Sequence, residues 1–277
     1  MRHTKIRGAS LSLSATIFLL VISVATPVCW GVPIHPKKGI PDFWQFAKDE
    51  WGDNFCAPTV AADSFWYYAN IKGYRELVKE EPAALITTLG EYMKTTAQTT
   101  RLEDAKNGLE KFISDRKCDP QNRPKDGLTV GMVLFPSFEN LVRELSRCQD
   151  LILLAIPVGE RFGHYFGAEG YDSAPGADPN FWFVDPKDDK ANEHYDDPLN
   201  PEKYSYDPYK LSSEKKNVWT GSKWEERQVT TFPYQFGNTW YLHSMIHVSP
   251  VPEPATLFLV GAGLLGLAVY GRRRIKV

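Results

Sequence analysis

The sequence has little net charge, and this limits the kind of partner it can have. Its 277 residues include 32 basic and 34 acidic side chains, and the formal net charge at pH 7 is −2. So small a difference gives no broad electrostatic footprint for nucleic acid, and we expect no such partner. Internal repeats and low-complexity tracts are lacking too. The central part of the chain is therefore interpreted as one substantial domain, or as a domain with a large insertion.

The N-terminal residues predict a signal peptide over 1–31. A basic start, MRHTKIRG, is followed by the apolar stretch LSLSATIFLLVISVA and then by small residues. This order is typical of a secretory signal, with possible cleavage after Ala25 or after Gly31. Signal peptidase is therefore an expected processing partner, and the mature protein is expected to work outside the cytoplasm.

The C-terminal residues 251–277 have the order of a sorting tail. An apolar run of sixteen residues, 255–270, follows Val-Pro-Glu-Pro and precedes three arginines, which should stay cytoplasmic. At ~1.5 Å per residue it predicts a short transmembrane segment of about 24 Å. The tail closely resembles the PEP-CTERM sorting signal of Gram-negative bacteria, although a plain anchor helix is an alternative. The resemblance implies exosortase processing, a transient membrane anchor, a cell-envelope or extracellular location, and a possible polysaccharide matrix partner.

Cysteine is scarce, with four residues in the whole chain. Cys118 and Cys148 end two successive helical patterns, so a disulfide between them is geometrically plausible and could contribute roughly 3–4 kcal/mol on the chain-entropy model. The later cleavage site would remove Cys29 and leave Cys56 over, and an unpaired thiol in an exported protein needs a reason. The earlier site would keep Cys29, which could then pair with Cys56.

The mature body, residues 32–250, reads as helices followed by strands. Apolar spacing predicts helices over 56–70, 82–98, 101–117 and 137–148, with Pro58 in the first turn of the first and Ser137 as N-cap of the last. Strands are predicted over 151–158, 163–172, 180–185 and 238–249. Residues 187–236 are charged, aromatic and proline-rich without clean periodicity, so we expect a long surface insertion. This order predicts an α+β fold.

Cys56 has the position of a nucleophile. Such chemistry needs a thiolate, a neighbouring base and a group that orients the base. The N-terminus of a helix favours the anionic form of a thiol, and Cys56 begins the helix 56–70. His164 is the best placed of the six histidines, because it opens a strand directly after Gly163. His243 and His247 alternate on the last strand, but no acidic or cysteine partner lies nearby and we expect no metal site.

Strand register selects Asp185 as the orienting acid. If the strands on either side of the segment SAPGA form a hairpin, Ala168 faces Phe181 and His164 faces Asp185. Asp172 then stands at the turn, eight residues from His164 and about 26 Å away at ~3.3 Å per residue. Only Asp185 can reach the imidazole.

Four stretches resemble one family. CAPTVAADSFWYYA is similar to the nucleophile helix of papain-like bacterial cysteine peptidases, especially relatives of the bacteriocin leader-processing peptidases. GHYFGAEGYD and FWFVDP resemble their histidine strand and Asp-Pro strand, and LGEYMKTTAQTTRLEDAKNGLEKFI resembles exported members with the same tail. The likeness covers about residues 40–190. It implies a papain-like fold, in which a helical N-terminal half packs on an antiparallel sheet, with Cys56 as nucleophile, His164 as general base and then acid, and Asp185 as orienter.

One position departs from the family pattern. The family usually has a glutamine roughly six residues before the cysteine, where its amide helps to hold the oxyanion. This chain has Glu50 there, and an ionised carboxylate cannot donate a hydrogen bond. We expect Asn54 to take this role, with Gln45 as the less favoured candidate and the backbone N–H of Cys56 as a second donor.

The leading functional hypothesis is therefore an exported cysteine peptidase that hydrolyses a peptide or protein substrate through a thioester acyl-enzyme. The alternative is a catalytically weak or inactive surface module that keeps the fold and binds peptide or matrix polymer. Acyl transfer to an amine would use the same residues. No cofactor and no metal is expected in any of these cases.

Overall fold

The computed structural model describes residues 40–46, 52–117, 127–147, 150–172, 180–187, 207–234 and 237–250, all within one compact unit. Several predicted features lie outside these ranges: the signal peptide, the tail with its segment 255–270, Glu50, and the cysteines Cys29, Cys118 and Cys148. Among the described residues, no helix is long and apolar enough to cross a membrane.

The four predicted helices all form. They are α2 (Cys56–Asn70), α3 (Pro82–Tyr92), α4 (Leu102–Lys117) and α5 (Phe138–Ser146), with short 3₁₀ turns η1 (Gly52–Asn54) and η2 (Arg75–Leu77). Ser137 caps α5 as expected, because its side chain accepts from the Asn140 N–H while the Asn140 side chain accepts from the Ser137 N–H. Helix α3 ends six residues before the predicted end at 98, since Lys94 turns the chain with a left-handed φ of 51°.

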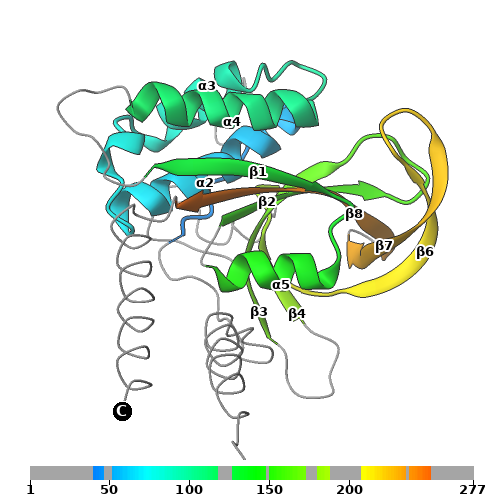
Figure 1. Cartoon of the computed structure of the whole chain (residues 1–277). Coiled ribbons are helices and arrows are strands. Elements are labelled where there is room, and N and C mark those ends of the chain that lie inside the picture. The colour runs from blue at the N-terminus through cyan, green and yellow to red at the C-terminus, as the bar shows by residue number, and fades with distance from the viewer. Residues whose placement is uncertain are drawn as a thin grey trace, which may run out of the picture. The chain divides into compact units, whose positions relative to one another are not determined.

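Eight antiparallel strands make one sheet. They are β1 (Leu128–Leu134), β2 (Asp150–Pro157), β3 (His164–Asp172), β4 (Asn180–Val184), β5 (Asp207–Lys210), β6 (Ser212–Trp219), β7 (Trp224–Tyr234) and β8 (Asn238–Pro250). The order is β5-β4-β3-β2-β8-β7-β6, and β1 pairs with β8. Helices α2, α3 and α4 cover one face and α5 lies on the other (Figure 1). The predicted α+β class is confirmed at this level.

The range 187–236 differs from its prediction. In its described part the chain forms strands β5, β6 and β7 of the sheet, in place of an irregular surface segment. The physical reason is that β6 pairs through its backbone with β7 and none of its charged residues is buried, so its charge does not oppose strand formation. Strand β1 was not predicted at all.

The predicted hairpin register was also wrong. Strands β3 and β4 do pair in antiparallel fashion, but Ala168 faces Phe183, not Phe181. A register shift between Ala168 and Gly170 adds one further residue of offset towards the turn. Asp185 therefore follows the last paired residue of β4 and does not lie within the ladder.

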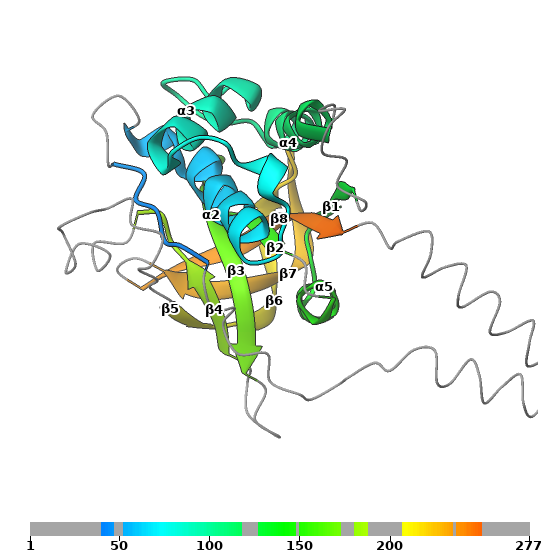
Figure 2. The same ribbon diagram turned by 90° about the vertical axis from the view of Figure 1, so that its left-hand side faces the viewer.

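Two apolar clusters lie on opposite faces of the sheet. One joins α2, α3 and α4 to β2, β3 and β8, and it includes the stacked rings of Phe65 and Phe112, whose centroids are 5.1 Å apart. The other joins α5 to β2, β3, β4, β7 and β8 and is rich in aromatic rings. Helix α2 lies directly against β3, as Figure 2 shows from the side. The Tyr68 hydroxyl also donates to the Val248 carbonyl at 2.7 Å, so α2 is bound to β8 as well.

Replacing Phe112 with alanine should lower the free energy of unfolding by about 3–5 kcal/mol, because a fully buried ring that stacks on Phe65 would leave a cavity. The matched control is Phe162→Ala, since Phe162 is 75% exposed and should change stability little. Urea unfolding followed by circular dichroism measures both. Equal effects of the two substitutions would contradict this account of the helical core.

Candidate functional site

Cys56 is the first residue of α2 and carries a free, buried thiol. Its relative exposure is 6%. The preceding residue, Phe55, supplies no side-chain cap, and the first helical hydrogen bond joins the Thr59 N–H to the Phe55 carbonyl. The free N–H groups of the first turn are therefore able to donate to another acceptor. They favour a negative charge on the sulfur itself.

His164 and Asp185 form a close buried pair. The His164 Nε2 atom lies 2.7 Å from Asp185 Oδ1, and the two side chains are 8% and 4% exposed. Because Nε2 faces the carboxylate, Nδ1 is the ring nitrogen that remains for the sulfur of Cys56. The structure thus brings together the three residues that the sequence analysis selected.

Three donors converge on the Asp185 carboxylate. Besides His164, the Lys187 N–H donates to Oδ1 at 2.9 Å and the Tyr234 hydroxyl donates to Oδ2 at 2.5 Å. Burial alone raises the pKa of Asp185, but the His164 charge and these hydrogen bonds outweigh it and lower that pKa below its usual value. The carboxylate is therefore held ionised and in one orientation.

The charges around His164 favour its protonated form. Burial lowers its pKa, whereas the Asp185 carboxylate and the sulfur of Cys56, through charge and hydrogen bonding, raise it to about 10. Burial and Cys56 also raise the pKa of Tyr165, the next residue of β3, and for a tyrosine this favours the neutral form. Cys56, His164 and Tyr165 thus share one electrostatic environment where α2 meets β3.

Gly163 allows His164 this position. A Cβ atom built on Gly163 would lie 1.9 Å from the carbonyl oxygen of Ala155 on β2. No other residue fits this gap without moving the backbone, so the glycine lets β3 begin close to β2. The sequence analysis identified the small residue before His164, and its physical reason is this close approach.

The segment 40–46 lies against the same region and carries Gln45. The Phe43 N–H donates to the buried carboxylate of Asp63 on α2 at 2.9 Å, and the Gln45 N–H donates to the Pro186 carbonyl at 3.0 Å. Gln45 is fully buried, and its side-chain amide has no hydrogen-bond partner among the described residues. Since Pro186 follows Asp185, the backbone of Gln45 lies close to the residues of the histidine–carboxylate pair.

Asn54 is differently engaged. Its side-chain Nδ2 donates to the Ala97 carbonyl at 2.7 Å, and its own carbonyl oxygen accepts from the Thr100 hydroxyl at 3.2 Å. One of the two N–H donors of the side chain expected to help an oxyanion is thus used to hold the loop after α3, and this bond fixes the direction of the amide.

Tyr234 is the residue that sequence reasoning missed. Its ring lies parallel to the His164 ring, with centroids 6.4 Å apart, and Phe166 contacts both rings edge-on. Trp240 packs against Tyr234 from behind. The local signal was the uncharged, β-branched and aromatic run Val-Thr-Thr-Phe just before it in β7, which the charge of the preceding residues obscured.

No metal site accompanies this arrangement within the described ranges, where His, Cys, Asp and Glu side chains form no group of three or more that could hold an ion. His243 and His247, the pair considered on the last strand, lie on β8 in different surroundings. His243 is buried beside Phe135, whereas His247 is half-buried and close to Ser249.

Comparison with known proteins identifies the tail. Residues 250–274 match a family model described as the PEP-CTERM protein-sorting motif. No curated protein matches the chain. The protein is therefore an exported one with a C-terminal sorting signal of the PEP-CTERM type, and this signal implies processing by an exosortase.

Proposed function

We propose that the protein is an exported cysteine peptidase with a papain-like fold, in which Cys56, His164 and Asp185 act together. One observation carries the proposal: a buried imidazole, hydrogen-bonded to a carboxylate through Nε2, also interacts with a thiol at the N-terminus of a helix. A histidine with a purely structural role would need only the carboxylate or only the thiol as a partner. A nucleophile, a base and an orienting acid in this order are what acyl transfer to sulfur requires.

The mechanism follows from the atoms present. The Cys56 thiol gives its proton to Nδ1 of His164, and the Asp185 carboxylate stabilises the resulting imidazolium. The thiolate attacks the carbonyl carbon of a peptide bond, and the amine leaves with the proton that His164 returns. Water, deprotonated by His164, then attacks the thioester, releases the acid product and restores the thiol.

Gln45 is a better candidate than Asn54 for the side chain that donates a hydrogen bond to the oxyanion. An oxyanion needs donors that no other group occupies, and the Asn54 amide is bound to Ala97 whereas the Gln45 amide is not satisfied by any described residue. The Cys56 N–H at the start of α2 is the second donor. Substrate binding would give the buried Gln45 amide the acceptor that it lacks.

The complete burial of Gln45 also favours the second candidate, a weakly active or inactive module that binds peptide. A donor with no exposed surface must be reached by movement of the segment 40–46. In such a module the Cys56–His164 pair could still form, but turnover would be slow. Reactivity of the thiol and hydrolysis of a substrate therefore have to be measured separately.

His164→Ala should slow alkylation of Cys56 by iodoacetamide at mildly acid pH by at least about 10²-fold, because the thiolate loses its imidazolium partner. Hydrolysis of fluorescently quenched casein should fall by a similar factor and should vanish in Cys56→Ser. His247→Gln is the control, since it changes a histidine outside the site. Equal alkylation rates in wild type and His164→Ala would refute the paired thiolate, while fast alkylation without casein hydrolysis would favour the binding module.

Asp185→Asn should lower the pKa of His164 from about 10, because the variant removes the carboxylate charge that raises it most, while burial, which lowers it, remains. The imidazolium of the wild-type protein should then persist above neutral pH, and that of the variant should be lost at a lower pH. The ring resonances of His164 in NMR spectra report this titration directly. Identical titration curves for the two proteins would show that Asp185 does not control the ring.

Tyr234→Phe should raise the pKa of Asp185, because the hydroxyl that donates to Oδ2 lowers it. The acid limb of the pH profile of Cys56 alkylation should accordingly move to higher pH. The matched control is Tyr92→Phe, which removes another tyrosine hydroxyl that donates to a carboxylate, that of Asp115 at 2.8 Å. A shift of equal size in the control, or none in Tyr234→Phe, would exclude this positioning role.

A further inference from the structure

Strand β1 has an open edge, which Figure 1 shows in front of the sheet between α4 and α5. Among the described strands, β1 pairs only with β8. The Phe135 N–H donates to the His243 carbonyl at 2.8 Å, and residues of an antiparallel ladder alternate between bonded and non-bonded pairs. The N–H and C=O groups of Val130, Met132 and Leu134 therefore point away from β8.

The residues of β1 do not protect this edge. The strand, Leu-Thr-Val-Gly-Met-Val-Leu, has no charge and no proline, and Leu134 is 51% exposed. By contrast, the edge strand β6 carries Glu214, Lys215 and Lys216, and β5 has four residues, one of them a proline. Natural sheets protect their edge strands from pairing with charged residues, with proline or by keeping the strand short. Among the edge strands β1, β5 and β6, β1 is the one without such protection.

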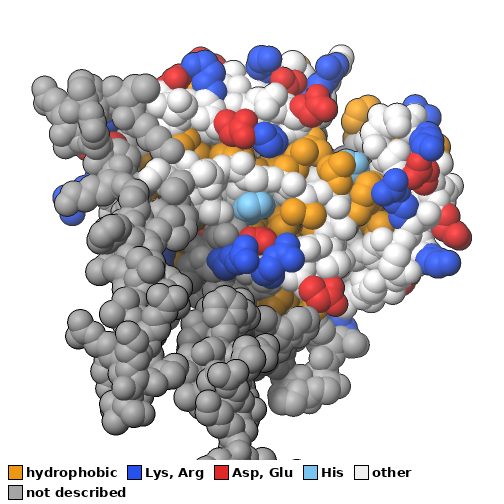
Figure 3. Space-filling view, viewed as in Figure 1, with side chains coloured by type: hydrophobic (Ala, Val, Ile, Leu, Met, Phe, Trp, Pro, Cys, Tyr) orange, Lys and Arg blue, Asp and Glu red, His pale blue; other side chains and the backbone are white. Residues whose placement is uncertain are grey.

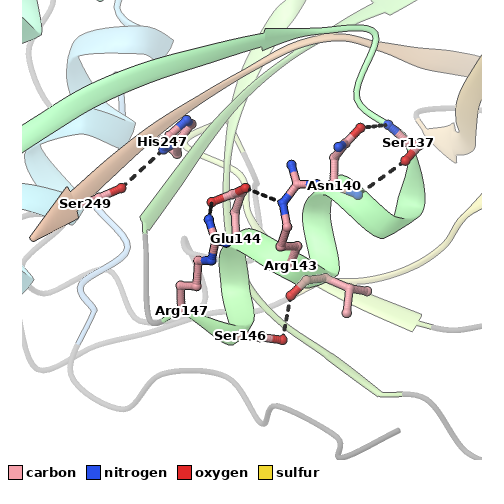
Figure 4. Close-up of polar contacts among 9 residues, drawn as sticks. Ser137, Asn140, Arg143, Glu144, Ser146, Arg147, His247 and Ser249 are labelled. Atoms are coloured by element: carbon pink, nitrogen blue, oxygen red, sulfur yellow. Dashed lines mark hydrogen bonds and ion pairs between the residues drawn. The ribbon is translucent and has the colours of Figure 1, made fainter. Parts of the chain in front are cut away.

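A pair of arginines lies on the α5 side of this edge. The Glu144 carboxylate, 5% exposed, accepts from Arg143 Nε at 2.8 Å and lies 3.5 Å from Arg147 Nη1 (Figure 4). The arginine side chains are 49% and 60% exposed, so their remaining N–H groups face solvent. Two positive charges against one negative leave a basic surface. His247 lies between it and β1, over Gly131.

The other side of the edge is apolar. Val130 and Met132 are half-buried against the helical core, and with Leu134 they share the strand face towards α4. The space-filling view shows hydrophobic side chains in a band at the level of β1, with basic side chains below it (Figure 3). A strand added to this edge would meet apolar side chains on one face and arginines on the other.

We propose that the edge of β1 binds an extended peptide segment of a protein partner, as an added antiparallel strand with apolar and acidic residues in alternation. The backbone of Val130, Met132 and Leu134 supplies the hydrogen bonds. Acidic side chains of the peptide meet Arg143 and Arg147, and its apolar side chains meet the α4 face of β1. Strand alternation places the two kinds on opposite faces.

Charge favours this occupant over a second copy of the chain. Antiparallel pairing of β1 with its own copy has a two-fold axis perpendicular to the sheet, so both α5 helices would lie on one face. Arg143 and Arg147 would then meet their own equivalents, and like charges across an interface disfavour association. An acidic peptide has the complementary charge.

The surface is separate from the proposed catalytic residues. His164 on β3 pairs with Ala155 of β2, which pairs with Leu242 of β8, whereas Gly131 of β1 pairs with His247. Five residues of β8, roughly 17 Å at ~3.4 Å per residue, separate Leu242 from His247. The inference therefore does not depend on the peptidase proposal.

The test uses the purified full-length protein and a fluorescein-labelled heptapeptide, Thr-Val-Glu-Val-Glu-Val-Thr, in fluorescence anisotropy titrations. The double variant Arg143→Gln, Arg147→Gln should raise the Kd about tenfold, because it removes the charge-assisted contacts. The control Arg75→Gln, Arg101→Gln removes two exposed arginines elsewhere and should leave the Kd unchanged. Lysine in place of glutamate in the peptide should also weaken binding at least tenfold.

Backbone pairing is tested with the wild-type protein by modifying only the peptide, so the result does not depend on the folding of any protein variant. Two peptides are N-methylated at alternate sets of residues, and only the set whose N–H groups face β1 should lose binding. Equal binding by both methylated peptides would reduce the contact to charge attraction and overturn strand addition, as would failure of the unmodified peptide to bind. Dimerisation of the wild-type protein, seen by light scattering and undisturbed by excess peptide, would assign the edge to a second copy and would also overturn the proposal.

Discussion

The contact between the start of α2 and the start of β3 supports every other feature of the candidate site. It places Cys56, whose helix begins without a side-chain cap, beside His164, whose strand begins where Gly163 approaches the Ala155 carbonyl. Neither backbone leaves room for adjustment, because the helix is packed into the core along its length and the glycine admits no side chain. The position of the sulfur relative to the imidazole is thus fixed by packing and not by the two side chains themselves.

Burial makes this contact chemically strong. In a medium of low polarity, the charges of Asp185, His164 and Cys56 interact more strongly than they would in water. The aromatic rings of Phe166, Tyr234 and Trp240 exclude solvent from one side of the pair. The Tyr234 hydroxyl adds the hydrogen bond that keeps the carboxylate ionised despite its burial. The aromatic rings therefore exclude water from the site, and the hydroxyl of one of them, Tyr234, supplies a hydrogen bond to the buried carboxylate.

The length of β8 organises the rest of the sheet. Its first residues pair with β7 and its later residues pair with β1, while β2 runs along its other edge. This division brings Tyr234, at the end of β7, to the histidine–carboxylate pair at one end of the sheet. At the other end it leaves the outer edge of β1 open beside Arg143 and Arg147. One long strand thus separates the proposed chemistry from the proposed recognition surface.

The sequence by itself determined the helices, four of the strands and the positions of Cys56 and His164, because each has a local signal: apolar spacing, a cap such as Ser137, a cysteine at a helix start, or a histidine after glycine. Asp185 was selected from the expected strand pairing, and that choice survived the error in its register. The sequence also determined the sorting tail, through the order of motif, apolar run and arginines. The register of β3 with β4 was not determined locally, since the shift near Ala168 has no distinct sequence pattern.

Only the tertiary structure decided the place of β5 to β7 in the sheet, the role of Tyr234 and the engagement of Asn54. Each depends on a partner far along the chain: β6 needs β7 to bury its backbone, Tyr234 needs Asp185, and Asn54 needs Ala97. The open edge of β1 likewise results from which strands pair with β8. Such partners are selected by packing of the whole domain, and residue type and spacing alone do not encode them.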